Sequence, residues 1–212
     1  MSHAILSGVA TVVLPLEDRD RLVRRARFLA WVGISWHFAE AAIAIAAGLA
    51  ASSIALIGFG IDSLIETLAG FVVLWRFSGV ADPQRERSAQ RLVAVSFYVL
   101  AAYVGVEATR ALFSDERAGE SWVGIGLAAF TVVTMPMLAA AKGRVARALH
   151  SHSAEAESRQ TVLCAYLSGA LLVGLGGNAL FGLWWLDPLT ALVIAGVALR
   201  EGGAAWRGED CC

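Results

Sequence analysis

Two carboxylates lie inside a stretch of this sequence that is otherwise apolar enough to cross a bilayer. Asp62 and Glu66 fall near the middle of residues 58–76, GFGIDSLIETLAGFVVLWR. Residues four apart in an α-helix share a face about one turn apart, so this pair is able to hold one cation. A carboxylate at membrane depth costs at least about 2.5–3.5 kcal/mol, so such residues tend to mark ion or proton pathways. The alternative is a pair of structural carboxylates, each hydrogen-bonded or neutralised by a neighbouring helix.

A second ionisable pair lies in the apolar segment that precedes this one. His37 and Glu40 are three residues apart and therefore share a helix face. One interpretation is a buried pair that ties this helix to a neighbour. The other is a direct or indirect contribution to the cation site. The sequence leaves both interpretations open.

A third pair repeats the spacing of four in a later apolar segment. Gln160 and Cys164 share a helix face there. A thiolate is a strong ligand for borderline and soft cations, and a glutamine carbonyl is a weak oxygen donor. A free cysteine is also a common small apolar core residue, so the spacing alone does not decide its role.

Two further groups of metal-binding residue types lie outside the apolar segments. His150 and His152 are separated by one residue, and two solvated histidines are the simpler interpretation because no third ligand is placed nearby. Cys211 and Cys212 end the sequence beside acidic residues. Whether either group binds metal stays open.

The composition predicts the helices that must position these residues. The sequence is 58% hydrophobic and 17% charged, with a mean hydropathy of +0.65, whereas soluble domains are roughly 45–50% apolar and about 25% charged. We therefore expect an all-α membrane protein, and the absence of a basic patch interleaved with aromatic residues argues against a nucleic-acid partner. A membrane helix needs about 20 mainly apolar residues. Six segments are assigned as such helices: residues 28–50, 54–75, 92–112, 122–141, 160–181 and 184–199.

The remaining segments are polar and predict the domain organisation. Residues 17–27 indicate a cytosolic helix leading into the membrane, whereas residues 76–91 and 142–159 indicate polar loops. We divide the chain into a cytosolic N-terminal segment (1–27), a six-helix transmembrane domain (28–206) and a short tail ending in cysteines (207–212).

The positions of the basic residues predict the orientation in the membrane. Six spans put both termini on one side, and of the 17 Lys and Arg residues only Arg110 and Arg117 fall on the opposite side. Basic residues concentrate in cytoplasmic loops, so we expect both termini in the cytosol.

Together these residues resemble the cation diffusion facilitator family of divalent-metal transporters. The segment GFGIDSLIETLAGFVVLWR is similar to the family's helix 2 signature, with Asp62 and Glu66 at its paired ligand positions. The segment WLDPLTALVIAGVAL resembles the start of the family's helix 6, and the resemblance extends from about Trp31 to Leu199. Aligned on the family's helix 5, Gln160 and Cys164 take the second pair of ligand positions, where the family usually has His and Asp. The family's usual cytosolic C-terminal domain has no counterpart, so the chain looks like the family's short branch.

The resemblance implies six membrane helices, a homodimer formed through them, and export of a divalent cation from the cytosol across the plasma (inner) membrane in exchange for protons. The expected site comprises Asp62, Glu66, Gln160 and Cys164, with His37 or Glu40 as a compensating group. Zinc is the first expectation for the metal, and cobalt, cadmium, iron and manganese stay open because of the changed helix 5 pair. We expect no cofactor besides the transported ion.

Two alternatives to a transporter stand beside this expectation. The first is a membrane protein that binds or senses metal without moving it, and the second is a family member with a purely structural role. We do not expect an enzyme, because no nucleophile–base arrangement accompanies the carboxylates.

Overall fold

The protein is a bundle of six long helices in the computed structural model, which describes residues 16–76, 78, 83–114 and 117–207. In that part of the chain no β-strand occurs, and all six helices are long and apolar enough to cross a membrane. The helices are α1 (Leu16–Ala51), α2 (Ile54–Arg76), α3 (Pro83–Phe113), α4 (Trp122–Leu149), α5 (His152–Phe181) and α6 (Leu186–Arg207). Large apolar side chains are exposed on every helix, as expected for a surface that faces lipid. The prediction of an all-α, multi-pass membrane protein is therefore confirmed.

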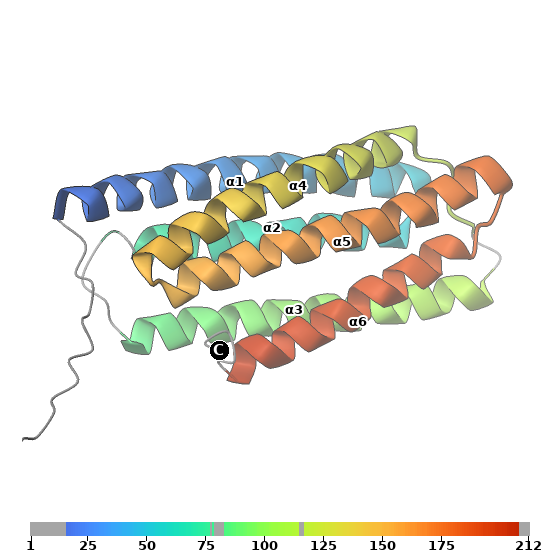
Figure 1. The fold of residues 1–212 in the computed structure, drawn as a ribbon. Helices are drawn as coiled ribbons and strands as arrows, with labels where there is room; N and C mark the ends of the chain where they lie inside the picture. Colours follow the sequence, from blue (N-terminus) through green and yellow to red (C-terminus); the bar gives the residue numbers. More distant parts are fainter. Residues whose placement is uncertain (1–15, 77, 79–82, 115–116, 208–212) are drawn as a thin grey trace, which may run out of the picture.

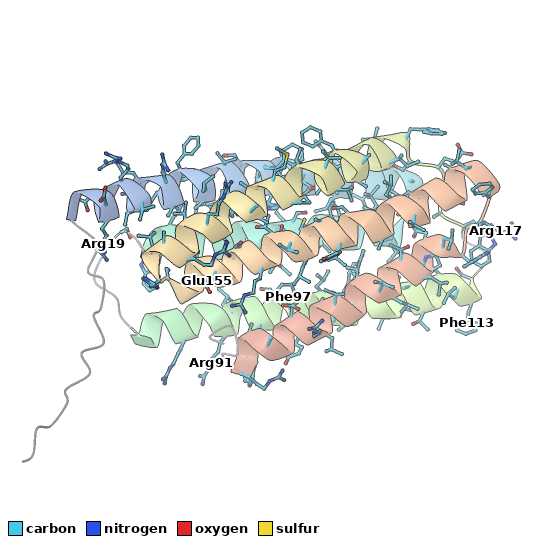
Figure 2. All side chains as sticks on the ribbon, in the orientation of Figure 1. Arg19, Arg91, Phe97, Phe113, Arg117 and Glu155 are labelled. Atoms are coloured by element: carbon cyan, nitrogen blue, oxygen red, sulfur yellow. The ribbon has the colours of Figure 1, made fainter. Side chains whose placement is uncertain are left out.

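The helices form three layers of two (Figure 1). The first layer holds α1 and α4, the middle layer α2 and α5, and the third α3 and α6. Successive helices run in opposite directions, so the start of α1, the α4–α5 turn and the end of α6 lie toward one end of the bundle, which we call the terminal end. In Figure 2, Arg19 and Arg91 lie toward this end and Arg117 lies at the other. The most buried of the six candidate spans is that of α2, the helix with Asp62 and Glu66.

The helices extend further into the polar segments than the hydropathy of the sequence predicted. The predicted polar loop of residues 76–91 is wrong in its second half, because α3 already begins at Pro83. The predicted loop of residues 142–159 is also wrong, because α4 continues to Leu149 and α5 begins at His152. These polar segments are rich in Ala, Arg, Gln and Glu, which favour helix. Hydropathy identifies only the part of a helix that lies within the bilayer.

Other ends of the helices agree better with the sequence. The charged segment of residues 17–27 is helical, as predicted, and forms the first part of α1. The short turn before α2 is confirmed, with Ser52 at a positive φ of 52°. The last helix begins at Leu186 and reaches Arg207, whereas residues 184–199 were predicted.

The α4–α5 connection is a tight turn at His150. This residue has left-handed backbone angles (φ 49°, ψ 44°), and its N–H bonds to carbonyl groups in the last turn of α4. Two helices joined this closely must lie side by side and antiparallel, which brings the polar ends of α4 and α5 together.

The first turn of α2 is held by a side chain from another helix. Asp187, in the first turn of α6, accepts hydrogen bonds from the Ser53 hydroxyl (2.5 Å) and from the backbone N–H groups of Ile54 (3.1 Å) and Ala55 (3.4 Å). Asp187 lies in the first turn of α6, yet these hydrogen bonds cap α2. The N–H groups of the first helical turn have no acceptor within the helix, so they can donate to an acceptor on a neighbouring element.

Glycines let α1 and α2 pack closely. A Cβ atom on Gly60 of α2 would lie 2.7 Å from Ile45 Cγ1 and 3.2 Å from the Ala41 carbonyl oxygen, both in α1. Close approach through small residues is the usual way in which membrane helices associate. It brings the ionisable residues of α1 against those of α2.

Candidate metal centre

The candidate site forms where α1 crosses the carboxylates of α2. His37 Nδ1 lies 3.2 Å from Glu40 Oε2 on its own helix and 2.9 Å from Glu66 Oε2 on α2. All three side chains are buried, and Glu40 is 0% exposed. With two carboxyl groups this close to one ring nitrogen, at least one proton must lie among the three groups, on the nitrogen or on a carboxyl oxygen, because otherwise all three would be acceptors.

Glu40 joins four helices. Its Oε2 accepts a hydrogen bond from Ser63 of α2 (3.1 Å), and its Oε1 accepts one from Thr131 of α4. Cys164 Sγ of α5 lies 4.0 Å from Glu40 Oε2. A buried charge is tolerated only when it is paired and hydrogen-bonded, and Glu40 meets both conditions.

Three of these side chains have the composition of a metal site. One potential ligand atom each from His37, Glu40 and Cys164 lies within 4.8 Å of the other two, and no other such group occurs in the described part of the chain. Imidazole, carboxylate and thiolate are the ligands of Zn²⁺ and related cations. Ligand atoms around a tetrahedral zinc lie roughly 3.5 Å apart, given bonds of about 2.0–2.3 Å, so small side-chain movements would close the group around an ion.

Several polar atoms beside this group are buried without a hydrogen-bond partner. They are His37 Nε2, Gln160 Nε2 and both carboxylate oxygens of Glu66, of which Oε2 has only its ion-pair contact with His37. Each unsatisfied buried group costs about 1–3 kcal/mol, and more when it is charged. A bound ion, a ligand or a water molecule is the usual partner of such atoms, and here they lie on all three helices that hold the predicted residues.

The structure therefore brings together residues from all three predicted pairs. His37, Glu40, Glu66 and Cys164 meet directly. Asp62 is 5% exposed and interacts electrostatically with His37, Glu66 and Glu40, although it lies outside the group of three. Gln160 lies one turn before Cys164, and its amide nitrogen is buried without a hydrogen-bond partner. We had placed α1 beside the site as a possible contributor, and its two residues lie at the centre.

Sequence reasoning missed the hydroxyl groups and one buried cation. Ser63 and Thr131 hold Glu40, yet isolated hydroxyls in an apolar segment carry no signal of their own. Lys142 was assigned to a loop, but it lies in α4 and forms a buried ion pair of 2.8 Å with Glu157 of α5. Helical propensity across residues 142–159 was the signal that would have found this pair.

Of the remaining candidates, only His150 is described together with its side chain. His150 is the exposed residue of the α4–α5 turn. The side chain of His152 and the whole of Cys211 and Cys212 lie outside the described residues. Glu107 and Arg110 form an ion pair on α3 at 2.7 Å, with Arg110 exposed.

Compared with known proteins, the chain matches no family model and no curated protein. The resemblance to the cation diffusion facilitator family therefore rests on the residues named above.

Proposed function

We propose that this protein is a secondary transporter that exports a divalent transition-metal cation from the cytosol in exchange for protons. The observation that carries the proposal is the group of His37, Glu40 and Cys164 beside Glu66, buried between helices long enough to cross a membrane. Ionisable residues in such a position mark ion pathways by default.

The donor set favours a zinc-like cation. His37 and Glu40 supply a nitrogen and an oxygen, Cys164 supplies a sulfur, and Glu66 has an oxygen without a hydrogen-bond partner. A site with thiolate and imidazole favours zinc, cobalt or cadmium over hard cations that prefer oxygen ligands alone. Asp62 and Gln160 lie one helical turn from these ligands and take part in the ion's passage.

Proton exchange follows from the same contacts. His37 Nδ1 lies within 3.2 Å of a carboxylate oxygen of Glu40 and of Glu66, so these three groups share protons in a small volume. A cation that binds these oxygens competes with the proton for them, because both are stabilised by the same negative charge. Binding the metal therefore releases a proton, and releasing the metal takes one up.

We further propose that the terminal end faces the cytosol, on the distribution of Lys and Arg, and that the protein acts in the plasma membrane as a homodimer. The ion then enters from the terminal end and leaves at the other. Movement of helices about a fixed site near the middle of the bilayer provides alternating access.

Metal flux into proteoliposomes tests the proposal. We expect saturable uptake of one metal among zinc, cobalt, cadmium, iron and manganese, enhanced by a pH gradient. Asp62→Ala should abolish this uptake in a protein that still folds, and Glu107→Gln, an exchange on the surface of α3, should not change it. Binding without flux would indicate a metal sensor, and neither binding nor flux would leave Asp62 and Glu66 as structural carboxylates.

A further inference from the structure

A second buried ionic group lies between α4 and α5, apart from the metal centre. Lys142 Nζ donates to Glu157 Oε1 at 2.8 Å and to the Thr161 hydroxyl at 3.2 Å. Lys142 is 5% exposed and Glu157 is 8% exposed. Taking such a pair out of water costs several kcal/mol per ion, so packing alone does not explain its presence.

Two glycines, one on α1 and one on α2, face this ion pair. A Cβ atom on Gly33 of α1 would lie 2.7 Å from Lys142 Nζ, and one on Gly70 of α2 would lie 3.6 Å from Glu157 Oε1. The ion pair, together with Ile34 of α1, therefore fills the space where α1, α2, α4 and α5 meet. No side chain on either glycine separates it from the backbones of α1 and α2.

The pair lies on the terminal side of the metal centre. Gly33 precedes His37 by one turn on α1, and Gly70 follows Glu66 by one turn on α2. Glu157 precedes Cys164 by about two turns on α5. With a rise of about 1.5 Å per residue, the three helices agree on a displacement of roughly 6–10 Å toward the terminal end.

The packing of the bundle indicates how this level can open. The most extensive contacts of α1 are with α2, and those of α4 are with α5, whereas contacts between the two pairs are fewer. Lys142, Glu157 and Thr161 all belong to the α4–α5 pair. Parting α1–α2 from α4–α5 at this level therefore leaves the ion pair intact and exposes it to water.

We propose that the Lys142–Glu157 pair is the seal that closes the ion path between the terminal end and the metal centre. In this conformation it lies against Gly33 and Gly70 and shuts the path. When the helix pairs part, hydration of the two charges offsets the packing that is lost, and the pair becomes part of a wet lining. The inference rests on the proposed function for the identity of the path, but the seal is measurable without transport.

Reaction of the buried thiol of Cys164 measures the seal directly. The background is Cys211→Ser/Cys212→Ser, which leaves Cys164 as the only cysteine of the chain. The protein is placed in nanodiscs with a chelator, so that both faces are accessible, and treated with a charged thiol reagent that does not enter lipid. We expect slow labelling, because Cys164 is 1% exposed.

Two double variants distinguish the space that the ion pair fills from the charges that it carries. Neither variant leaves one ion without its partner. Lys142→Ala/Glu157→Ala empties the space, and we expect Cys164 to be labelled several-fold faster. Lys142→Met/Glu157→Gln keeps the volume but removes the charges, so we expect slow labelling together with reduced metal flux, because the seal no longer opens readily. Unchanged labelling in the alanine pair overturns the proposal, and so does undiminished flux in the Met/Gln pair of a protein shown to transport.

A matched control uses the ion pair at the other end of the bundle. Glu107→Ala/Arg110→Ala removes a pair of the same chemistry from α3, and we expect wild-type labelling and flux. Comparable acceleration in this control would show general loosening and would overturn the assignment. If the unsubstituted protein transports no metal, the proposed function is wrong. Faster labelling of the Lys142→Ala/Glu157→Ala variant would then still support the seal.

Discussion

His37 Nδ1 lies 2.9 Å from Glu66 Oε2, which joins α1 to α2 through an ionisable contact in which both side chains are buried. The two residues are far apart in the sequence, and the close packing at Gly60 brings their helices together. This contact connects His37 and Glu40 of α1 to the carboxylates of α2. The two pairs of residues therefore form one site.

Replacement of the imidazole tests whether α1 belongs to the metal site. His37→Gln removes the ring that contacts Glu40 and Glu66 while keeping a polar side chain. Loss of a ligand or of the group that orients one lowers metal affinity by about 10- to 100-fold, and we expect a loss of this size for zinc by titration calorimetry. Glu107→Gln is the control on the protein surface, and unchanged affinity in the His37 variant would exclude the imidazole and leave Glu40 as the α1 residue of the site.

Replacement of the thiol tests the preference for soft cations. Cys164→Ser exchanges a strong ligand for soft cations for a weak oxygen ligand of similar size. We expect cadmium transport to fall much more than manganese transport when both are measured in the same proteoliposomes. Cys211→Ser/Cys212→Ser removes the other two thiols and should leave the ratio unchanged. An equal fall for both metals would indicate that Cys164 serves packing alone.

The contact between α6 and the start of α2 predicts an effect on stability. Asp187→Ala leaves the Ser53 hydroxyl and the N–H groups of Ile54 and Ala55 without their acceptor. Loss of a helix cap costs about 0.5–2 kcal/mol, and we expect the upper end of this range for the free energy of unfolding in detergent. Asp187→Asn keeps one acceptor oxygen and should lose less. Equal losses in the two variants would show that the hydrogen bonds contribute little.

Glycine substitutions test the close packing of α1 on α2. Gly60→Ala places a methyl group 2.7 Å from Ile45 Cγ1, and such overpacking costs about 1–3 kcal/mol of unfolding free energy. Gly126→Ala is the matched control, because nothing lies within 4 Å of a Cβ atom at that position of α4. We expect the control to be neutral or slightly more stable, since alanine favours helix over glycine by up to about 1 kcal/mol. Equal stability of the two variants would contradict close packing as the cause.

The sequence was sufficient for the candidate residues and insufficient for their arrangement. Spacings of three and four within one helix are local, so the shared faces of Asp62 with Glu66 and of His37 with Glu40 follow from helix geometry alone. Which face meets which neighbour depends on contacts between helices. For that reason the central place of Glu40, with its bonds to Ser63 and Thr131, appeared only in the structure.

The same distinction between local spacing and contacts between helices explains the positions of Asp187 and Lys142. A carboxylate in a first helical turn favours the N–H groups of that turn, but α6 packs beside α2 and directs Asp187 to α2 instead. Lys142 was assigned to a polar loop because the chain becomes polar from that residue onward. The tight turn at His150 instead continues both helices and brings Glu157 opposite it.

By itself, the sequence determined six membrane-crossing helices and the ionisable residues within them, because the cost of placing polar groups in lipid acts on each segment separately. Only the tertiary structure decided that α1, α2, α4 and α5 converge on Glu40, and that a lysine and a glutamate close the space beside two glycines. Those features depend on how closely helices distant in sequence can approach, and that is set by the packing of small side chains at their crossings.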